Sequence, residues 1–198
     1  MVADLQETVE AALRAAAEDP DEGVRQAAVI ALEMCDTRRR VEDLVRGLDD
    51  PEKKVQVRSL YALGELRDVR ALQGLVQVMR SAPADLRGIA IRLLAKRRDD
   101  RAIGPLIEAL DDPSVDVRIL AVEALRVFQD RRLMDAFLAM LPSAEDDLKV
   151  KLLDVLGGIG DAGAVPVILP LLQDPSPNVR RLAAEALGQV ELPAEGAS

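Results

Sequence analysis

Histidine and tryptophan are both missing from this chain of 198 residues, and only one cysteine is present. Without histidine there is no imidazole to relay a proton from a serine or cysteine nucleophile, and no imidazole ligand for a metal. A single thiol cannot close an internal disulfide or build a multi-thiolate zinc site. Any catalysis would have to use carboxylates, lysine or the one tyrosine, so the composition favours a non-catalytic protein without a metal or cofactor.

Aromatic residues are scarce too, since Tyr61, Phe128 and Phe137 are the only three. Apolar residues still make up 49% of the chain, which predicts a core of ordinary size that is mainly aliphatic. The longest apolar run, Ala164 to Leu172, has nine residues, whereas a membrane-spanning helix needs about 20. The acidic first residues do not resemble a signal peptide, and with the lone thiol they indicate a soluble cytoplasmic protein.

Positive charge is in the minority, because 26 Lys and Arg residues stand against 35 Asp and Glu residues and give a formal net charge of −9. General affinity for DNA or RNA comes from basic side chains that neutralise phosphates. Stacking on bases needs aromatic side chains, and these are few here. The sequence therefore argues against a nucleic acid partner.

What the chain has instead is a repeat of 31 residues, which recurs six times without an insertion. Three columns mark it: a leucine, a basic or amide residue seven positions earlier, and an aliphatic residue one position before that. The columns are Leu32, Leu63, Leu94, Leu125, Leu156 and Leu187; Arg25, Gln56, Arg87, Arg118, Lys149 and Arg180; and Val24, Val55, Leu86, Val117, Leu148 and Val179. Repeats of this length are typical of solenoids, in which neighbouring units bury a shared core.

Each repeat is expected to hold two antiparallel helices. The first carries an apolar stripe such as Ile103, Leu106, Ile107 and Leu110. Acids precede both helices, and Asp is a good N-cap, while Pro is tolerated in the first turn. These acids are Asp68, Asp99, Asp130 and Asp161 before first helices, and Asp19-Pro20, Asp50-Pro51, Asp112-Pro113 and Asp174-Pro175 before second helices.

We place the repeats at about 2–36, 37–67, 68–98, 99–129, 130–160 and 161–191, in one solenoid domain over 1–191 with a flexible tail, 192–198. The second helices should begin near Pro20, Pro51, Ala82, Pro113, Ala144 and Pro175. In the first repeat, Glu10 and Arg14 stand where later repeats have Val41 and Val45, which predicts an end cap that faces water.

Four further local predictions follow from residue type. Cys35 shares a column with Leu66 and Phe128, so we expect a packed core thiol. Prolines inside the first helix of the sixth repeat should shorten or kink that helix. Glycines near the ends of second helices should act as C-terminal caps. The basic column should pair with turn acids of its own or the next repeat, as a structural ladder. The prolines are Pro166 and Pro170, and the glycines are Gly64, Gly157 and Gly188.

The motif D-P-x-x-x-V-R-x-x-A-x-x-A-L-G, seen from Asp174 to Gly188, resembles the HEAT repeat. The 31-residue length and the D-x-x-A start of the first helix are similar, more narrowly, to the short HEAT-like repeats of the phycobilisome lyase type. The resemblance implies an all-α, right-handed superhelix of six two-helix repeats whose second helices line a concave face. It also implies a protein-binding scaffold or, as an alternative, a bilin lyase subunit or a chaperone for bilin or phycobiliprotein.

Two other groups with similar repeats do not fit. The deoxyhypusine hydroxylases use His-Glu pairs to hold iron, and the chain has no histidine. A HEAT-like DNA repair glycosylase would need a basic, aromatic groove, which the net charge of −9 disfavours.

Some columns of the second helices vary freely in residue type, as in Ile30, Tyr61, Arg92, Glu123, Asp154 and Glu185. Such variation indicates an exposed face, and we predict that it binds a partner protein or peptide, with Tyr and Arg as anchors. A solvated helix face is the plainer alternative. The candidate partner-binding residues are Lys53, Lys54, Arg58, Tyr61, Ile89, Arg92, Lys96, Ile119 and Glu123.

The charges along this face change from basic through apolar to acidic, the last at Asp146, Asp147 and Asp154. Basic runs at 38–40, 96–98 and 131–132 are predicted to lie along one edge, where helix dipoles explain them and where an acidic partner or phosphate is a lesser alternative. Leu171, Leu172 and Leu182 have no following repeat to cover them, so we expect a monomer or a weak end-to-end oligomer.

Overall fold

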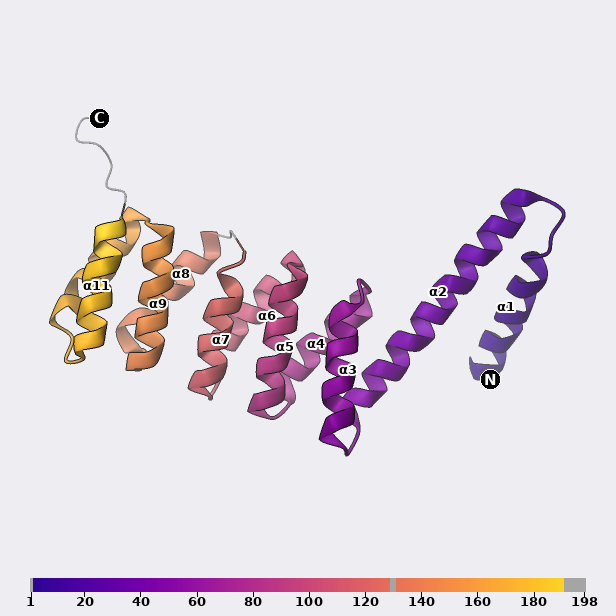
Figure 1. The fold of residues 1–198 in the computed structure, drawn as a ribbon, viewed down its shortest axis with the longest axis horizontal. Coiled ribbons are helices and arrows are strands. Elements are labelled where there is room, and N and C mark those ends of the chain that lie inside the picture. Colours follow the sequence, from indigo (N-terminus) through magenta and orange to yellow (C-terminus); the bar gives the residue numbers. More distant parts are fainter. Residues whose placement is uncertain (1, 129–130, 191–198) are drawn as a thin grey trace. The chain divides into compact units, whose positions relative to one another are not determined.

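The computed structural model describes residues 2–128 and 131–190 (Figure 1). These residues form eleven α-helices and six short 3-10 helices, with no strand among them. The chain divides into two compact units, residues 1–71 and 72–198. The predicted tail, 192–198, lies outside the described residues, and the predicted repeat boundaries stay a prediction.

The first unit holds three helices and the start of a fourth. They are α1 (Val2–Ala16), α2 (Glu22–Arg46), α3 (Lys53–Glu65) and α4 (Val69–Ser81). α1 packs against α2, and α2 contacts α3 (Figure 1). The carboxylate of Asp21 accepts a hydrogen bond from the Val24 amide at 3.0 Å and so caps the start of α2.

Helix α2 is longer than the repeat pattern predicts. It continues through residues 36 and 37, where one helix was expected to end and the next to begin. Thr37 stands there in the column of the helix-starting acids, and residues 24–46 contain neither glycine nor proline. With no strong cap and no helix breaker, the helix continues. The basic run 38–40 therefore lies inside α2 and not at a joint between repeats.

The predicted polar end cap is wrong at Glu10, whereas Arg14 is exposed as predicted. Glu10 is only 6% exposed, and its carboxylate accepts hydrogen bonds from Arg14 on α1, at 3.2 Å, and from Arg39 on α2. Glu10 thus ties α1 to α2 instead of facing water. Cys35 is half-buried beside a small cleft of about 290 Å³, so it is not a fully packed core thiol. Apolar side chains remain exposed on α1 and α2, namely Leu5, Val9, Val24, Val29, Ile30 and Met34.

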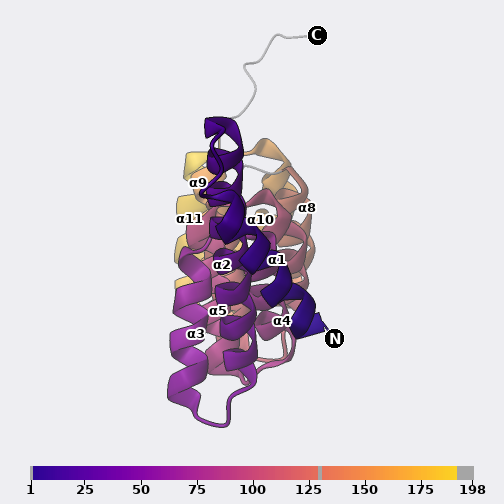
Figure 2. The ribbon, with the colours of Figure 1, turned by 90° about the vertical axis from the view of Figure 1, so that its right-hand side faces the viewer.

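The second unit has two layers of helices (Figures 1 and 2). One layer contains the second helices of the repeats: α5 (Ala84–Arg97), α7 (Val115–Leu125), α9 (Asp146–Ile159) and α11 (Pro177–Gln189), each packed against the next. The other contains most of α4 with α6 (Ile103–Glu108), α8 (Arg131–Met140) and α10 (Val165–Ile168). The second helices begin close to their predicted positions.

The core is aliphatic, as predicted. The leucine column is fully buried in four repeats, at Leu63, Leu94, Leu125 and Leu156. The prediction for the prolines is also confirmed: α10 has four residues and passes into a 3-10 helix, Leu169–Gln173. A proline inside a helix removes one backbone donor and crowds the preceding turn, which explains the short α10.

The glycine caps fall elsewhere than predicted. The residues with left-handed backbone at the ends of second helices are Gly160, with φ 69°, and Arg98, with φ 49°. Gly157 lies inside α9, where a Cβ would approach the Cα of Ala186 on α11 to 2.9 Å. Gly157 therefore allows α9 and α11 to pack closely. Gly64 and Gly188 likewise lie inside their helices, so the prediction of caps at these three glycines is wrong.

Gly157→Ala is expected to lower the free energy of unfolding by about 1–3 kcal/mol, because the added methyl group overlaps the backbone of α11. Gly158→Ala is the matched control, since nothing lies within 4 Å of a Cβ there. The control should be neutral or raise stability by about 0.5–1 kcal/mol through better helix propensity. Urea unfolding of both variants measures the difference, and equal effects would contradict the close approach of α9 and α11.

Leu125→Ala is expected to cost about 2–5 kcal/mol, because Leu125 is fully buried and its loss leaves a cavity. Val127→Ala removes a side chain that is 37% exposed and should change stability by less than about 0.5 kcal/mol. The midpoint of urea unfolding separates the two. A small effect at Leu125 would show that this column does not form the core.

Candidate functional site

Basic side chains of the repeat column join each repeat of the second unit to the following one. Arg87 on α5 donates from Nε and Nη2 to the two carboxylate oxygens of Asp112, at 2.7 and 2.6 Å. Both side chains are largely buried. The next two steps are single contacts: Arg118 donates from Nη2 to Glu145 at 2.6 Å, and Lys149 donates from Nζ to Asp174 at 2.8 Å. The predicted ladder between adjacent repeats is confirmed at these three steps.

The basic column also closes the turn before its own helix. Arg87 donates from Nη1 to the carbonyl oxygen of Ala82 at 2.8 Å, so within a repeat the acceptor is a backbone carbonyl and not the turn acid that we expected. A contact that recurs in most repeats is structural, because a catalytic group is needed only once. The same contact joins Arg118 to Asp112, Arg180 to Asp174, Arg25 to Asp19 and Gln56 to Asp50.

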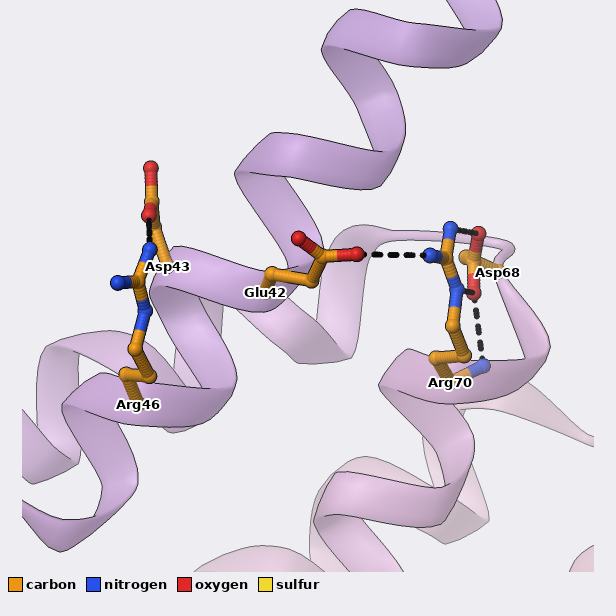
Figure 3. Close-up of polar contacts among 5 residues, drawn as sticks. All are labelled: Glu42, Asp43, Arg46, Asp68 and Arg70. Carbon is orange, nitrogen blue, oxygen red and sulfur yellow. Dashed lines mark hydrogen bonds and ion pairs between the residues drawn. The ribbon is translucent and has the colours of Figure 1, made fainter. Parts of the chain in front are cut away.

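An ion-pair cluster in the first unit joins α2 to the start of α4 (Figure 3). Arg70 binds Asp68 at 2.9 Å and reaches Glu42 on α2 at 3.5 Å. The hydrogen bond from Arg70 lowers the pKa of the Asp68 carboxyl group. On α2 itself, Arg46 pairs with Asp43 one turn away. Local partners therefore account for these charges, and the cluster has a structural role.

The predicted partner-binding residues are divided between the two units. In the first unit, Lys53, Lys54, Arg58 and Tyr61 are exposed on α3, and Tyr61 is 52% exposed. Lys54, Arg58 and Tyr61 follow one another at intervals of four and three residues, so they lie on one face of α3. This face presents two positive charges beside an amphipathic ring.

In the second unit, Arg92 and Lys96 are exposed on α5, and Glu123 is exposed on α7. Ile89 and Ile119 are half-buried and offer less surface than predicted. Glu123 forms an ion pair with Lys151 of α9 at 2.6 Å, so an ion pair also links neighbouring second helices on this surface. That these residues bind a partner stays a prediction.

Two repeat positions remain exposed in all four repeats of the second unit, on the second helix or, at Val127, directly after it, and we call them the second-helix stripe. Their exposure confirms that the variable columns are not packed. The stripe changes from basic on α5 to acidic on α9 and α11. Its residues are Arg92, Glu123, Asp154 and Glu185, together with Lys96, Val127, Gly158 and Gln189.

A cleft of about 910 Å³ lies beside α9 and was not predicted from the sequence. Both phenylalanines of the chain, Phe128 and Phe137, line it, with apolar residues of α8 and α9. Acidic side chains at Asp135, Asp154 and Asp161 also face it. The signal that could have found it is the occurrence of both phenylalanines only nine positions apart in an otherwise aliphatic chain.

The basic residues predicted to lie along one edge differ from one another in their surroundings. Arg97 is buried at the end of α5, and Arg98 adopts the left-handed conformation that ends this helix. The side chains of Arg131 and Arg132, like the predicted helix start at Asp130, lie outside the described residues. Within the described residues, no three carboxylate or thiol side chains gather where they could hold a metal, and no helix is both long and apolar enough to cross a bilayer.

Comparison with known proteins shows what the chain is similar to. A family model of HEAT repeats matches residues 9–87, 72–149 and 134–197. No curated protein matches the chain at a significant level. Among solved structures, the complex of CpcE and CpcF of phycocyanin lyase from Nostoc sp. PCC7120 is 24% identical over 76% of this chain, with a TM-score of 0.59. This chain spans 64% of the length of that one.

Two designed armadillo repeat proteins are similar over 90% of this chain and 98% of their own. One, in complex with the peptide (KR)4, is 20% identical with a TM-score of 0.58. The other, designed for modular peptide recognition, is 19% identical with a TM-score of 0.55. At these identities the likeness concerns the fold alone. The predicted fold class, an all-α solenoid of HEAT-like helix pairs, is confirmed.

Asp174→Asn is expected to lower the melting temperature at neutral pH and to lose this effect in acid. Hydrogen bonds from Lys149 and from the Ser176 amide lower the pKa of Asp174 in the folded protein. The folded state then binds this proton less readily than the unfolded chain, so the stabilisation is complete above the ordinary Asp pKa of about 3.9 and is lost as the pH falls through the lowered pKa.

Melting temperatures of the wild type and the variant, measured from neutral pH to about pH 3, test this linkage. Asp111→Asn is the control, because Asp111 is exposed and has no ion-pair partner among the described side chains. A difference at Asp174 that persists undiminished in acid would contradict the ladder contact as its cause.

Proposed function

The chain belongs to the HEAT-repeat family, and from this premise we propose that it is a non-catalytic scaffold or adaptor. In this proposal, a partner protein or peptide lies in a concave groove along the second helices and contacts their exposed side chains. The lone thiol supports a reducing, cytoplasmic setting for this function.

The observation that carries the proposal is the second-helix stripe. The neighbouring columns of the same helices are buried and aliphatic, whereas the stripe is exposed and changes from basic on α5 to carboxylates on α7, α9 and α11. Arg92, Glu123 and Asp154 occupy the same repeat position on three successive helices. Positions that form the core are thus separated from positions that are exposed and can contact a partner.

The charges along the stripe support a partner whose own charges follow the complementary order. The stripe is basic at Arg92 and Lys96 and acidic at Asp154 and Glu185, so a peptide lying along it would be oriented by complementary charges. A solenoid of this fold does bind a charged peptide, since one designed armadillo neighbour is in complex with (KR)4. Tyr61, the single tyrosine, and Arg92 are of the residue types favoured as anchors at interfaces.

A bilin lyase subunit, or a chaperone for bilin or phycobiliprotein, is the second candidate. It is favoured by the similarity to the phycocyanin lyase structure from Nostoc, which covers 76% of this chain. A lyase subunit would bind a linear tetrapyrrole and a phycobiliprotein subunit, whereas the scaffold proposed first would bind neither. Bound pigment therefore distinguishes the two functions.

Tyr61→Ala combined with Arg92→Glu is expected to abolish capture of a specific partner without unfolding the protein. Both side chains are exposed, so the free energy of unfolding should change by no more than about 0.5 kcal/mol. Affinity capture from a lysate of the source organism, with mass spectrometry and an absorption scan of the eluate, compares wild type and variant.

The control variant, Arg67→Glu with Gln73→Ala, changes two exposed residues that lie off the stripe. It should retain the partner that the first variant loses. Identical captures from all three proteins would contradict binding at these residues. A coloured eluate, or a phycobiliprotein subunit in it, would instead establish the second candidate.

A further inference from the structure

The cleft beside α9 lies next to the end of α7, which is shorter than the neighbouring second helices. α7 ends at Leu125, whereas α5 and α9 continue to Arg97 and Ile159, the residues that share the repeat position of Phe128. Arg126 and Phe128, which follow the end of α7, line the cleft together with α8 and α9. Its volume of about 910 Å³ lies in the range of sites that bind small molecules or side chains.

The walls of the cleft are apolar and firmly packed. Phe137 is completely buried, and Phe128, Leu133 and Val155 are each less than a tenth exposed. Ile159 lines the cleft as well and is 50% exposed. The accessible apolar surface of the cleft therefore comes mainly from Ile159 and from the half-buried Met134 and Leu138, above a floor of buried side chains. A large apolar group bound there would remove this surface from water.

Among the side chains that the structure describes, the charged ones at the cleft are mostly acidic. Asp135, Asp154 and Asp161 line the cleft together with Arg126. Asp161 also accepts a hydrogen bond from the Gly163 amide at 2.7 Å. Asp135 and Asp154 have no ion-pair partner among the side chains that the structure describes. The cleft thus attracts a positive charge next to an apolar group.

The cleft is continuous with the second-helix stripe, because Asp154 and Gly158 belong to both. We propose that it is an anchor pocket, which holds a large apolar or aromatic side chain of a partner peptide while Asp154 and Asp135 bind an adjacent Lys or Arg of that peptide. The inference rests on the proposed function and names the chemistry of its partner. Hot-spot residues of interfaces are typically such anchors in pockets, surrounded by polar contacts.

Gly158 provides a way to close the pocket without disturbing the fold. It lies in the last turn of α9 and lines the cleft, and no atom lies within 4 Å of a Cβ built there. Gly158→Leu should therefore occupy the cleft with its own side chain. Gly188→Leu is the matched control, because Gly188 lies in the last turn of α11, has equal space at its Cβ and does not line the cleft.

Three labelled peptides probe the pocket by fluorescence anisotropy with the full chain. Peptide KKAWAKK carries the expected anchor and charges, KKAGAKK lacks the anchor, and EEAWAEE reverses the charges. We expect the first to bind at least about tenfold more tightly than either of the others, since the burial of one large side chain accounts for a factor of this size. Gly158→Leu should weaken it by a similar factor, and Gly188→Leu should not.

Equal binding of the first two peptides, or unchanged binding to Gly158→Leu, would overturn the anchor pocket. Equal binding of the basic and acidic peptides that contain tryptophan would overturn its charge preference. Unfolding curves of both leucine variants confirm that the fold is kept. The proposed function is tested independently of the peptides. It is contradicted if the Tyr61 and Arg92 substitutions leave partner capture unchanged, whether or not the peptides bind.

Discussion

The shared burial of aliphatic surface between neighbouring helix pairs is the constraint on which this structure depends. One pair of short helices has too little interior to bury its own apolar stripe. In the second unit, the leucine column and its aliphatic neighbours are buried only because α5, α7, α9 and α11 pack in succession. Where α9 and α11 meet, at Gly157 against Ala186, even one methyl group has no room. Each repeat is therefore stable only as part of the stack.

This constraint also separates the residues that fold the chain from those that are free to bind. Two members of the basic column, Arg87 and Arg118, are engaged twice, by a carbonyl of their own turn and by an acid of the next repeat. The other members make one of these two contacts. These contacts account for the basic column of the repeat and for the acids Asp112, Glu145 and Asp174. What remains is the second-helix stripe, where no repeated contact fixes the residue type, and the cleft beside α9.

Much of the fold could be predicted from the sequence, because each structural position of the repeat is represented by six residues that can be compared. The column of Leu125 predicted the core, the Asp-Pro pairs predicted where second helices begin, and Pro166 and Pro170 predicted the short α10. The exposure of the Arg92 and Glu123 column could also be predicted, since a column that varies between opposite charges cannot be packed.

The features that could not be predicted lie where one repeat departs from the others. Continuation of α2 past Thr37 depends on a missing cap, which is a weaker signal than a cap that is present. Burial of Glu10 requires Arg39, a residue of another helix, at the right distance. The cleft arises because α7 ends early, and a repeat pattern averaged over six units hides such a local difference.

The spacing within the ladder has a consequence for how such a chain can change in length. Arg87 and Asp112 are 25 residues apart, and so are Lys149 and Asp174. Arg118 and Glu145 are 27 residues apart, so the link tolerates a small shift in the position of the acid. A link that recurs at nearly the same place in a 31-residue period lets the protein grow or shrink by whole repeats, because each junction is built from similar parts. Modularity of this kind allows a gene to lengthen or shorten the surface by duplication or deletion, without redesign of the interior.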